Sequence, residues 1–313
     1  MTDLLSARSP YSAIVDRPVL QLPNQGRLLV WIIVNVEHWS IERAMPRMVL
    51  SPPMGQPMLP DLPNWAWHEY GMRVGFWRLY DALNQRGIVP TMATNGIVCD
   101  SYPRIVEAAL KENWEIMGHG FVQGPMHKLP NQAESIMATV ETIQRMAGKP
   151  PVGWESPGLT EDDNTLDCLS QAGIEYVADW VLDDQPVWLN AKPKPVLSVP
   201  YTVEINDIPM MLLQQHRSEE MLVRGIDQFE RLWSESEKIP RVMARAQQRV
   251  QRRFECIDVP QGKDEGILFA IISGESPAVE WSLEAVKLMS ENGAIWGQSC
   301  GRHIASFCRQ LVH

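Results

Sequence analysis

The sequence lacks three features that place many proteins at once: paired cysteines, long apolar runs and an excess of positive charge. Its 313 residues hold five cysteines at wide, irregular spacings, which is typical of reduced thiols and not of a disulfide framework or a CxxC metal site. The longest apolar run, residues 28–34, is too short to span a membrane. With 28 basic and 38 acidic side chains the net charge is −10, which argues against nucleic acid as the main partner because phosphate binding needs a basic surface.

The N-terminus also lacks the basic start and apolar stretch of a secretory signal, so we expect a cytoplasmic protein. Two residue types are abundant instead: 12 tryptophans and 24 prolines. Many of the prolines fall between residues 46 and 63, in a loop long enough to be functional. Because tryptophan suits flat ligands, we expect an aromatic-walled pocket, covered by this loop, that binds a small molecule.

Strand-like and helix-like segments alternate along the chain. Residues 28–36 form a continuous apolar, β-branched run that predicts a strand buried on both faces. Further predicted strands are 89–93, 114–117, 151–154, 176–178, 196–202, 266–272 and 294–296. Predicted helices are 70–86, 102–111, 132–146, 160–173, 218–234 and 276–292. This alternation predicts an α/β fold, a barrel of parallel strands over residues 27–313 that follows an extended arm of residues 1–26.

In such a barrel the active site lies at the C-terminal ends of the strands. The residues found there are polar, ionisable or aromatic. They include Asn35, Glu37, Trp39, Asn95, His119, Glu155 and Trp180.

Glu37, His119 and His127 form the sharpest set. One carboxylate and two imidazoles can hold a zinc-like cation and leave a position open for water. The alternative is that the two histidines are unrelated surface or core residues.

Two further residues have a functional and a structural interpretation. Glu155 could act as a general base with a raised pKa, or it could cap a helix as a loop acid. Arg73 could anchor a substrate carbonyl, or it could form a salt bridge with Glu69. The arginine-rich stretch 241–253 is predicted to be a solvated helix rather than a nucleic-acid site, because the rest of the chain is acidic.

Several segments together resemble the polysaccharide deacetylase family, and especially its branch of metal-independent allantoinase and cyclic-imide hydrolases. The similar segments span about residues 28–243. They are LVWIIVNVEHW (29–39), EYGMRVGFWRL (69–79), TNGIVC (94–99), EIMGHGFVQGPMH (115–127), PVGWESPGLT (151–160), EYVADWVLDDQP (175–186) and YTVEINDIPMMLLQQH (201–216). The resemblance implies a distorted (β/α) barrel of about seven parallel strands. It also implies hydrolysis of a C–N bond in an amide, N-acetyl, imide or ureide group.

The chain departs from the family at the proton-transfer positions. The family's first motif carries two acids, a base and a metal ligand, and these positions match Asn35 and Glu37. Asn35 cannot accept a proton, so Glu155, in the third motif, is the candidate substitute base. The family's histidine pair is His-x3-His, and His127 lies four residues beyond the second position. The family's C-terminal histidine motif is not matched, which makes His216 a possible acid, and residues 244–266 look inserted.

From these observations we predict a hydrolase that attacks a carbon–nitrogen bond of a small cyclic or N-acyl amide, imide or ureide through a metal-bound water. A divalent metal, zinc by preference, is the expected cofactor, and a homo-oligomer, dimer or tetramer, is the expected assembly. The alternatives are a lyase, hydratase or decarboxylase, or a non-catalytic pseudoenzyme. The expected substrate-binding residues are Arg73, Trp39, Asn95, Trp180 and Asp184.

Overall fold

The structure is a computed structural model of the chain, and it describes residues 7–20, 22, 27–45, 50–51, 55–236 and 241–246. The elements predicted for residues 266–272, 276–292 and 294–296 therefore lie outside the described residues. So does the greater part of the insertion predicted for residues 244–266.

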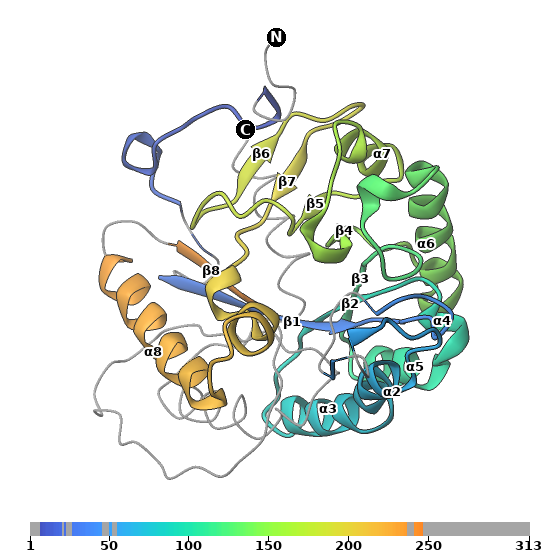
Figure 1. Cartoon of the computed structure of the whole chain (residues 1–313). Helices are drawn as coiled ribbons and strands as arrows, with labels where there is room; N and C mark the ends of the chain where they lie inside the picture. The colour runs from blue at the N-terminus through green and yellow to red at the C-terminus, as the bar shows by residue number, and fades with distance from the viewer. Residues whose placement is uncertain are drawn as a thin grey trace.

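The described strands form one curled sheet, around which the helices are arranged (Figure 1). Its strand order is β6-β7-β5-β4-β3-β2-β1-β8, and every neighbouring pair is parallel except β6 and β7. The strands are β1 (Leu28–Val36), β2 (Thr91–Thr94), β3 (Glu115–Gly118), β4 (Gly153–Trp154), β5 (Tyr176–Val177), β6 (Val187–Leu189), β7 (Val196–Ser198) and β8 (Arg241–Ala246). The predicted distorted barrel of about seven parallel strands is confirmed.

Helices follow the strands along the chain and pack outside the sheet (Figure 1). The α-helices are α2 (Leu62–Tyr70), α3 (Phe76–Asn84), α4 (Val98–Ser101), α5 (Pro103–Lys111), α6 (Gln132–Ala147), α7 (Thr165–Gln171) and α8 (Ser218–Glu235). A π-helical segment, η4 (Gly71–Gly75), joins α2 to α3. No helix in the described part of the chain has both the length and the apolar character needed to cross a bilayer.

The strand β1 is the centre of the core, and all nine of its residues are buried. Trp31, in β1, is fully buried, and its indole nitrogen donates a 2.8 Å hydrogen bond to the hydroxyl of Thr91 in β2. Its ring meets Tyr176 of β5 edge-on, with 5.8 Å between the ring centroids. The continuous apolar run seen in the sequence is thus a strand covered on both faces, as predicted.

Three elements differ from the sequence-based predictions. The stretch 241–246 is not helical: it is strand β8, which pairs in parallel with β1 from Leu28 to Ile33. The first helix after the Pro-rich loop begins at Leu62 and not at residue 70, because Pro63 fits the first helical turn, where no amide hydrogen is needed. Helix α7 begins at Thr165, so the acidic residues 161–163 precede the helix and do not belong to its first turn.

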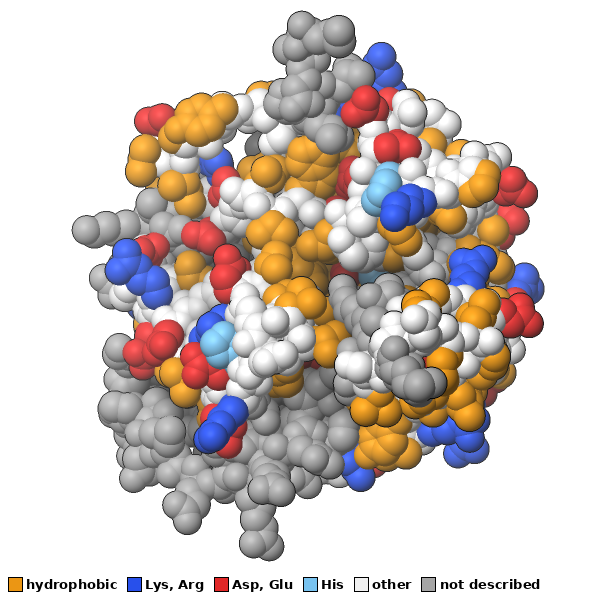
Figure 2. Space-filling model, in the orientation of Figure 1, with side chains coloured by type: hydrophobic (Ala, Val, Ile, Leu, Met, Phe, Trp, Pro, Cys, Tyr) orange, Lys and Arg blue, Asp and Glu red, His pale blue; other side chains and the backbone are white. Residues whose placement is uncertain are grey.

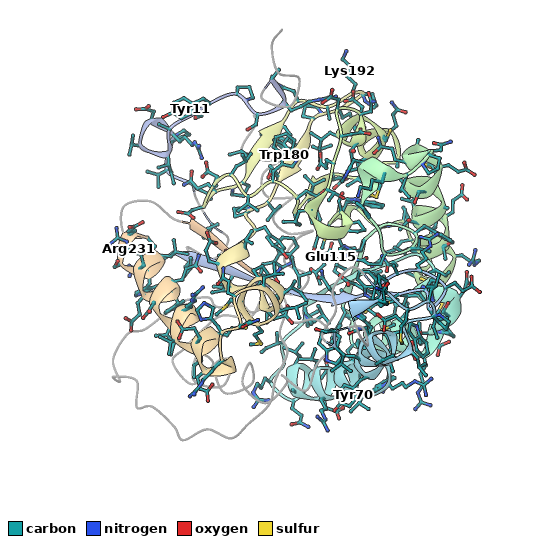
Figure 3. All side chains as sticks on the ribbon, in the orientation of Figure 1. Tyr11, Tyr70, Glu115, Trp180, Lys192 and Arg231 are labelled. Carbon is teal, nitrogen blue, oxygen red and sulfur yellow. The ribbon has the colours of Figure 1, made fainter. Side chains whose placement is uncertain are left out.

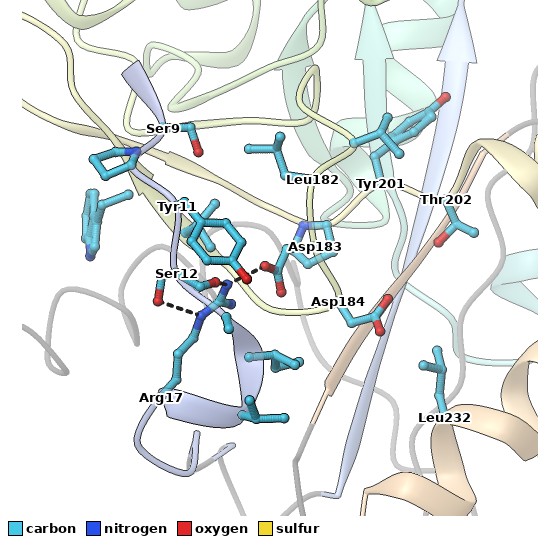
Figure 4. Close-up of a pocket in the computed structure, with 18 of the residues that line it drawn as sticks. Ser9, Tyr11, Ser12, Arg17, Leu182, Asp183, Asp184, Tyr201, Thr202 and Leu232 are labelled. Carbon is cyan, nitrogen blue, oxygen red and sulfur yellow. Dashed lines mark hydrogen bonds and ion pairs between the residues drawn. The ribbon is translucent and has the colours of Figure 1, made fainter. Parts of the chain in front are cut away.

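The described part of the N-terminal arm crosses the far end of the sheet. Arg8 forms an ion pair with Asp167 of α7 at 2.5 Å and donates a 3.0 Å hydrogen bond to the carbonyl of Asn190. Arg17 forms an ion pair with Asp183 at 2.6 Å (Figure 4). Tyr11 lies at the outer side of the arm and is 93% exposed (Figure 3). The arm is therefore attached by two arginines and by Leu22, which is buried in the core, while Tyr11 and Val15 remain exposed.

Candidate active site

Parallel strands bring residues from distant parts of the sequence to one edge of the sheet. Asn35 lies near the end of β1, Glu37 follows β1, His119 follows β3 and Glu155 follows β4. All four line a cavity of about 500 Å³. Hydrophobic side chains gather around the middle of this face of the molecule (Figure 2). The residues that follow the strands, where the sequence predicts the active site, therefore meet in one pocket.

Asn35 and Glu155 form a buried pair. The side-chain amide of Asn35 donates a 2.8 Å hydrogen bond to Oε1 of Glu155, and the two residues are 1% and 2% exposed. The other oxygens of the pair, Oδ1 of Asn35 and Oε2 of Glu155, are buried and have no hydrogen-bond partner among the described residues. Burial raises the pKa of Glu155 to about 7, against the opposing effects of His119 and Asn35. Glu155 can therefore exchange a proton near neutral pH.

His119 lies between this pair and Glu37. Its Nδ1 is 2.6 Å from the backbone carbonyl oxygen of Glu155, which can only accept, so Nδ1 carries a hydrogen. Its Nε2 is 3.3 Å from Oε1 of Glu37. Burial lowers the pKa of His119, but the hydrogen bond to Glu37 and the charges of Glu155 and Glu37 outweigh this and raise it to about 9. His119 can therefore act as a protonated donor.

The glycine before His119 is required by close packing. A Cβ atom on Gly118 would lie 2.5 Å from the ring of Trp154 in β4. The glycine after it, Gly120, has φ of +73°, a left-handed conformation that side chains rarely adopt. The Gly-His-Gly sequence thus turns the chain sharply while it holds His119 against β4.

Asn95 follows β2 and supports His119 from the other side. Its side-chain oxygen accepts a 2.8 Å hydrogen bond from the amide of His38, and its amide group donates to the backbone carbonyl of His119 and to Gln123. The side chain is fully buried. These bonds connect the ends of β1, β2 and β3, so Asn95 serves the protein scaffold, whereas the sequence suggested contact with substrate.

Of the other predicted substrate-binding residues, the structure brings only Trp39 to the cavity. Its indole nitrogen donates a 3.1 Å hydrogen bond to Oε2 of Glu37. Trp180 donates to Glu161 at 2.9 Å and lies over the strands beyond β4 (Figure 3). Asp184 borders a second hollow of about 1000 Å³ beneath the N-terminal arm (Figure 4).

Arg73 and His216 also lie outside the lining of the cavity. The side chain of Arg73 is 72% exposed and forms a 2.9 Å ion pair with Glu69, which is the structural alternative that the sequence left open. His216 lies 3.0 Å from Arg224 of α8. The structure therefore does not place His216 where it could deliver a proton within this pocket.

The described residues do not provide the donor set of a catalytic zinc site. His127 is exposed, in the short helix η5 (Met126–Lys128), and does not line the cavity. Only Glu37 and His119 of the three predicted ligands converge, and within the described residues no group of three or more His, Cys, Asp or Glu could hold a metal ion. Because catalytic zinc sites use three protein ligands, we derive no step through a metal.

Tyr201 also lines the cavity, although no sequence motif pointed to it. Tyr201 is 4% exposed, its hydroxyl accepts a 2.7 Å hydrogen bond from Asn206, and burial raises the pKa of the phenol well above its usual value. It borders both the cavity and the hollow beneath the arm. Its position three residues after β7 was the available signal.

Residues 67–177 match the family model described as polysaccharide deacetylase. The predicted resemblance is confirmed.

Three proteins show how far the similarity extends. A Schizosaccharomyces pombe protein whose name places it among the polysaccharide deacetylases is 26% identical over 194 residues, which cover 56% of this chain and 61% of that protein. The chain thus spans less than two thirds of this curated relative.

Two solved structures share the fold over nearly the whole chain. A probable polysaccharide deacetylase from Pseudomonas aeruginosa PAO1 has a TM-score of 0.76 at 20% identity, with 96% of this chain and 98% of that chain covered. The PuuE allantoinase has a TM-score of 0.74 at 18% identity, with 96% and 97% covered. At these identities the similarity concerns the fold alone. The similarity thus covers the fold and residues 67–177, and the residues of the pocket must indicate the reaction.

Proposed function

We propose that the protein hydrolyses a carbon–nitrogen bond in a small cyclic or N-acyl amide, imide or ureide, with Glu155 as the general base. One observation carries this proposal: a buried carboxylate, held at one oxygen by Asn35, leaves its other oxygen without a partner in the described part of the cavity. A buried acceptor without a partner is costly, and a water molecule or a substrate N–H would satisfy it.

The proton steps use only side chains of this pocket. Glu155 takes a proton from water as the water oxygen attacks the substrate carbonyl, and a tetrahedral oxyanion forms. When the C–N bond breaks, His119 gives a proton to the leaving nitrogen, and the proton on Glu155 then returns to His119 through solvent. Glu37 stabilises the imidazolium, as its 3.3 Å distance from Nε2 supports.

The shape of the cavity supports a compact substrate. About 500 Å³ holds a small molecule, and Trp39, Tyr201 and Met45 supply apolar walls. Residues 40 and 43–45, in the segment after β1, also line it. The Pro-rich loop that we expect to cover the pocket begins at residue 46, and its residues 46–49 and 52–54 lie outside the described part. The net charge of −10 supports a neutral substrate over a polyanion.

The test is a panel of cyclic imides, cyclic ureides and N-acetylated amines, assayed for the carboxylate product by proton NMR. We expect turnover of at least one class, and we expect it to survive dialysis against EDTA, because the described donors are too few for a zinc site. Activity lost on dialysis and restored by zinc would show that a metal takes part. No turnover of any class, by a folded protein, would contradict the proposal and favour a lyase or a pseudoenzyme.

The pH profile of kcat/KM tests the assignment of the two proton-transfer groups. Glu155 acts as a base only when ionised, so activity should rise with pH through about 7, the raised pKa of its carboxyl group. His119 acts as an acid only when protonated, so activity should fall as pH passes about 9, the raised pKa of its imidazole. We expect a bell-shaped curve, measured in buffers of constant ionic strength; a curve without the acidic limb would contradict Glu155 as the base.

A further inference from the structure

A second pair of acids, Glu161 and Asp179, lies behind the site and does not line the cavity. Asp179 follows β5 and is 8% exposed. Its Oδ1 accepts a 2.6 Å hydrogen bond from the backbone amide of Ser156. Glu161 accepts a 2.9 Å hydrogen bond from the indole of Trp180. One oxygen of each acid, Oε2 of Glu161 and Oδ2 of Asp179, is buried and has no hydrogen-bond partner among the described residues. A proton shared between the two carboxyl groups would satisfy both oxygens and would relieve the repulsion between two buried negative charges.

The bond from Ser156 connects Asp179 to the proton-transfer groups through one peptide unit. The amide of Ser156 and the carbonyl of Glu155 belong to the same peptide bond. On one side the amide donates to Asp179 at 2.6 Å, and on the other side the carbonyl accepts from Nδ1 of His119, also at 2.6 Å. Hydrogen bonds in such a chain polarise one another, because a negative charge at the amide increases the electron density on the carbonyl oxygen.

We propose that Asp179 is a positioning residue: it fixes the Glu155–Ser156 peptide, whose carbonyl orients His119, while Glu161 supplies the proton that the acid pair shares. The catalytic consequence rests on the proposed function, whereas the hydrogen-bond chain can be observed without any substrate. Asp179 acts on His119 as a carboxylate does when it hydrogen-bonds a catalytic imidazole directly, but with a peptide unit between them.

The surroundings support an ionised Asp179 and a protonated Glu161. Burial raises the pKa of Glu161 to about 9, and the charge of Asp179 contributes to this rise. Burial also raises the pKa of Asp179, but the hydrogen bonds from Glu161 and from Ser156 oppose this. The charged and titratable groups that face His119 are Glu37 from the end of β1 and Glu155 from the end of β4, with Asp179 one peptide further away.

NMR of protein labelled with 15N-histidine, 15N-serine and 13C-carbonyl glutamate tests the hydrogen bonds from Asp179 to His119 directly. The last two labels select the amides of Glu–Ser steps, among them Ser156. In the wild type we expect a strongly downfield Ser156 amide proton and an observable, slowly exchanging Nδ1 proton on His119. In Asp179→Asn the Ser156 amide should move upfield and the Nδ1 proton should broaden or vanish. Unchanged signals in this variant, or their absence in the wild type, would overturn the proposal.

Two further variants locate the proton and control for general damage. Glu161→Gln keeps a hydrogen-bond donor toward Asp179, so both NMR signals should persist. If Glu161→Gln loses the signals while Asp179→Asn keeps them, Asp179 is not the positioning residue. Asp167→Asn removes a carboxylate that pairs with Arg8 and takes no part in the hydrogen bonds between Asp179 and His119, so it should leave both signals in place.

With a substrate from the panel, Asp179→Asn should lower kcat on the order of 100-fold while KM changes little, because it misplaces His119 and removes no substrate contact. Loss of the NMR signals without loss of turnover would overturn the catalytic part alone. Absence of turnover in the wild type would instead contradict the proposed function and leave the NMR test standing.

Discussion

Replacement of Glu155 by Gln is expected to lower kcat/KM by about 10²- to 10⁴-fold, the range typical of a lost general base. Gln has nearly the same shape and can still accept the hydrogen bond from Asn35, so the pocket should keep its form. It cannot take a proton from water. The measurement is steady-state kinetics on the substrate found in the panel. Glu107→Gln, a matched change on the exposed face of α5, should retain full activity.

The same variant is expected to be more stable than the wild type at neutral and alkaline pH. The folded pKa of Glu155, about 7, lies above the ordinary value of 4.5, so the folded state binds the proton more tightly than the unfolded state. The wild type therefore loses stability as pH rises from about 4.5 to about 7, by up to about 3 kcal/mol, and the Glu155→Gln variant avoids that loss. Thermal unfolding at pH 4.5 and pH 8 measures it. Equal melting temperatures at pH 8 would contradict a strongly buried carboxylate.

Replacement of Gly153 by Ala is expected to destabilise the protein by about 3 kcal/mol, at the upper end for overpacked cores. A Cβ atom at this position of β4 would lie 2.1 Å from the ring of Tyr176, which is too close for any real contact. Tyr176 has no exposed surface, and its ring packs edge-on against Trp31, so it cannot move aside without disturbing β1.

Urea unfolding followed by tryptophan fluorescence measures this effect. Gly124→Ala is the matched control: Gly124 has nothing within 4 Å of the position where a Cβ would be added, so its variant should stay within about 0.5 kcal/mol of the wild type. A Gly153→Ala variant as stable as this control would show that β4 and β5 can separate more than the packing indicates.

The fold was predictable where local pattern and tertiary packing agree. The apolar run of β1 was predicted at its observed bounds, and helix α6 ended one residue from its prediction, before Gly148 in a left-handed conformation. The segment 241–246 was not predictable, because its arginines and alanines favour a helix while pairing with β1 imposes a strand. Long-range pairing of this kind leaves no mark in a short sequence window.

The site was predictable to the extent that it follows the ends of strands. That rule led to Glu37, His119 and Glu155, which the structure brings together. It could not show that Asn35 donates to Glu155, because the partner depends on how adjacent strands are aligned. Glu161 was expected in the first turn of the helix predicted for residues 160–173, where acidic residues suit the helix dipole. The structure starts α7 at Thr165, so Glu161 lies before the helix, where its carboxyl group accepts a hydrogen bond from Trp180.

The N-terminal arm has a consequence for the order in which the chain folds. Arg8 meets Asp167 and Asn190, partners that lie 159 and 182 residues further along the sequence. Contacts with such a large sequence separation form late, because the loop between the partners must close first. During synthesis Arg8 therefore has neither of these partners until about 160 further residues have followed it. The arm can therefore attach only after α7 and β6 have been synthesised.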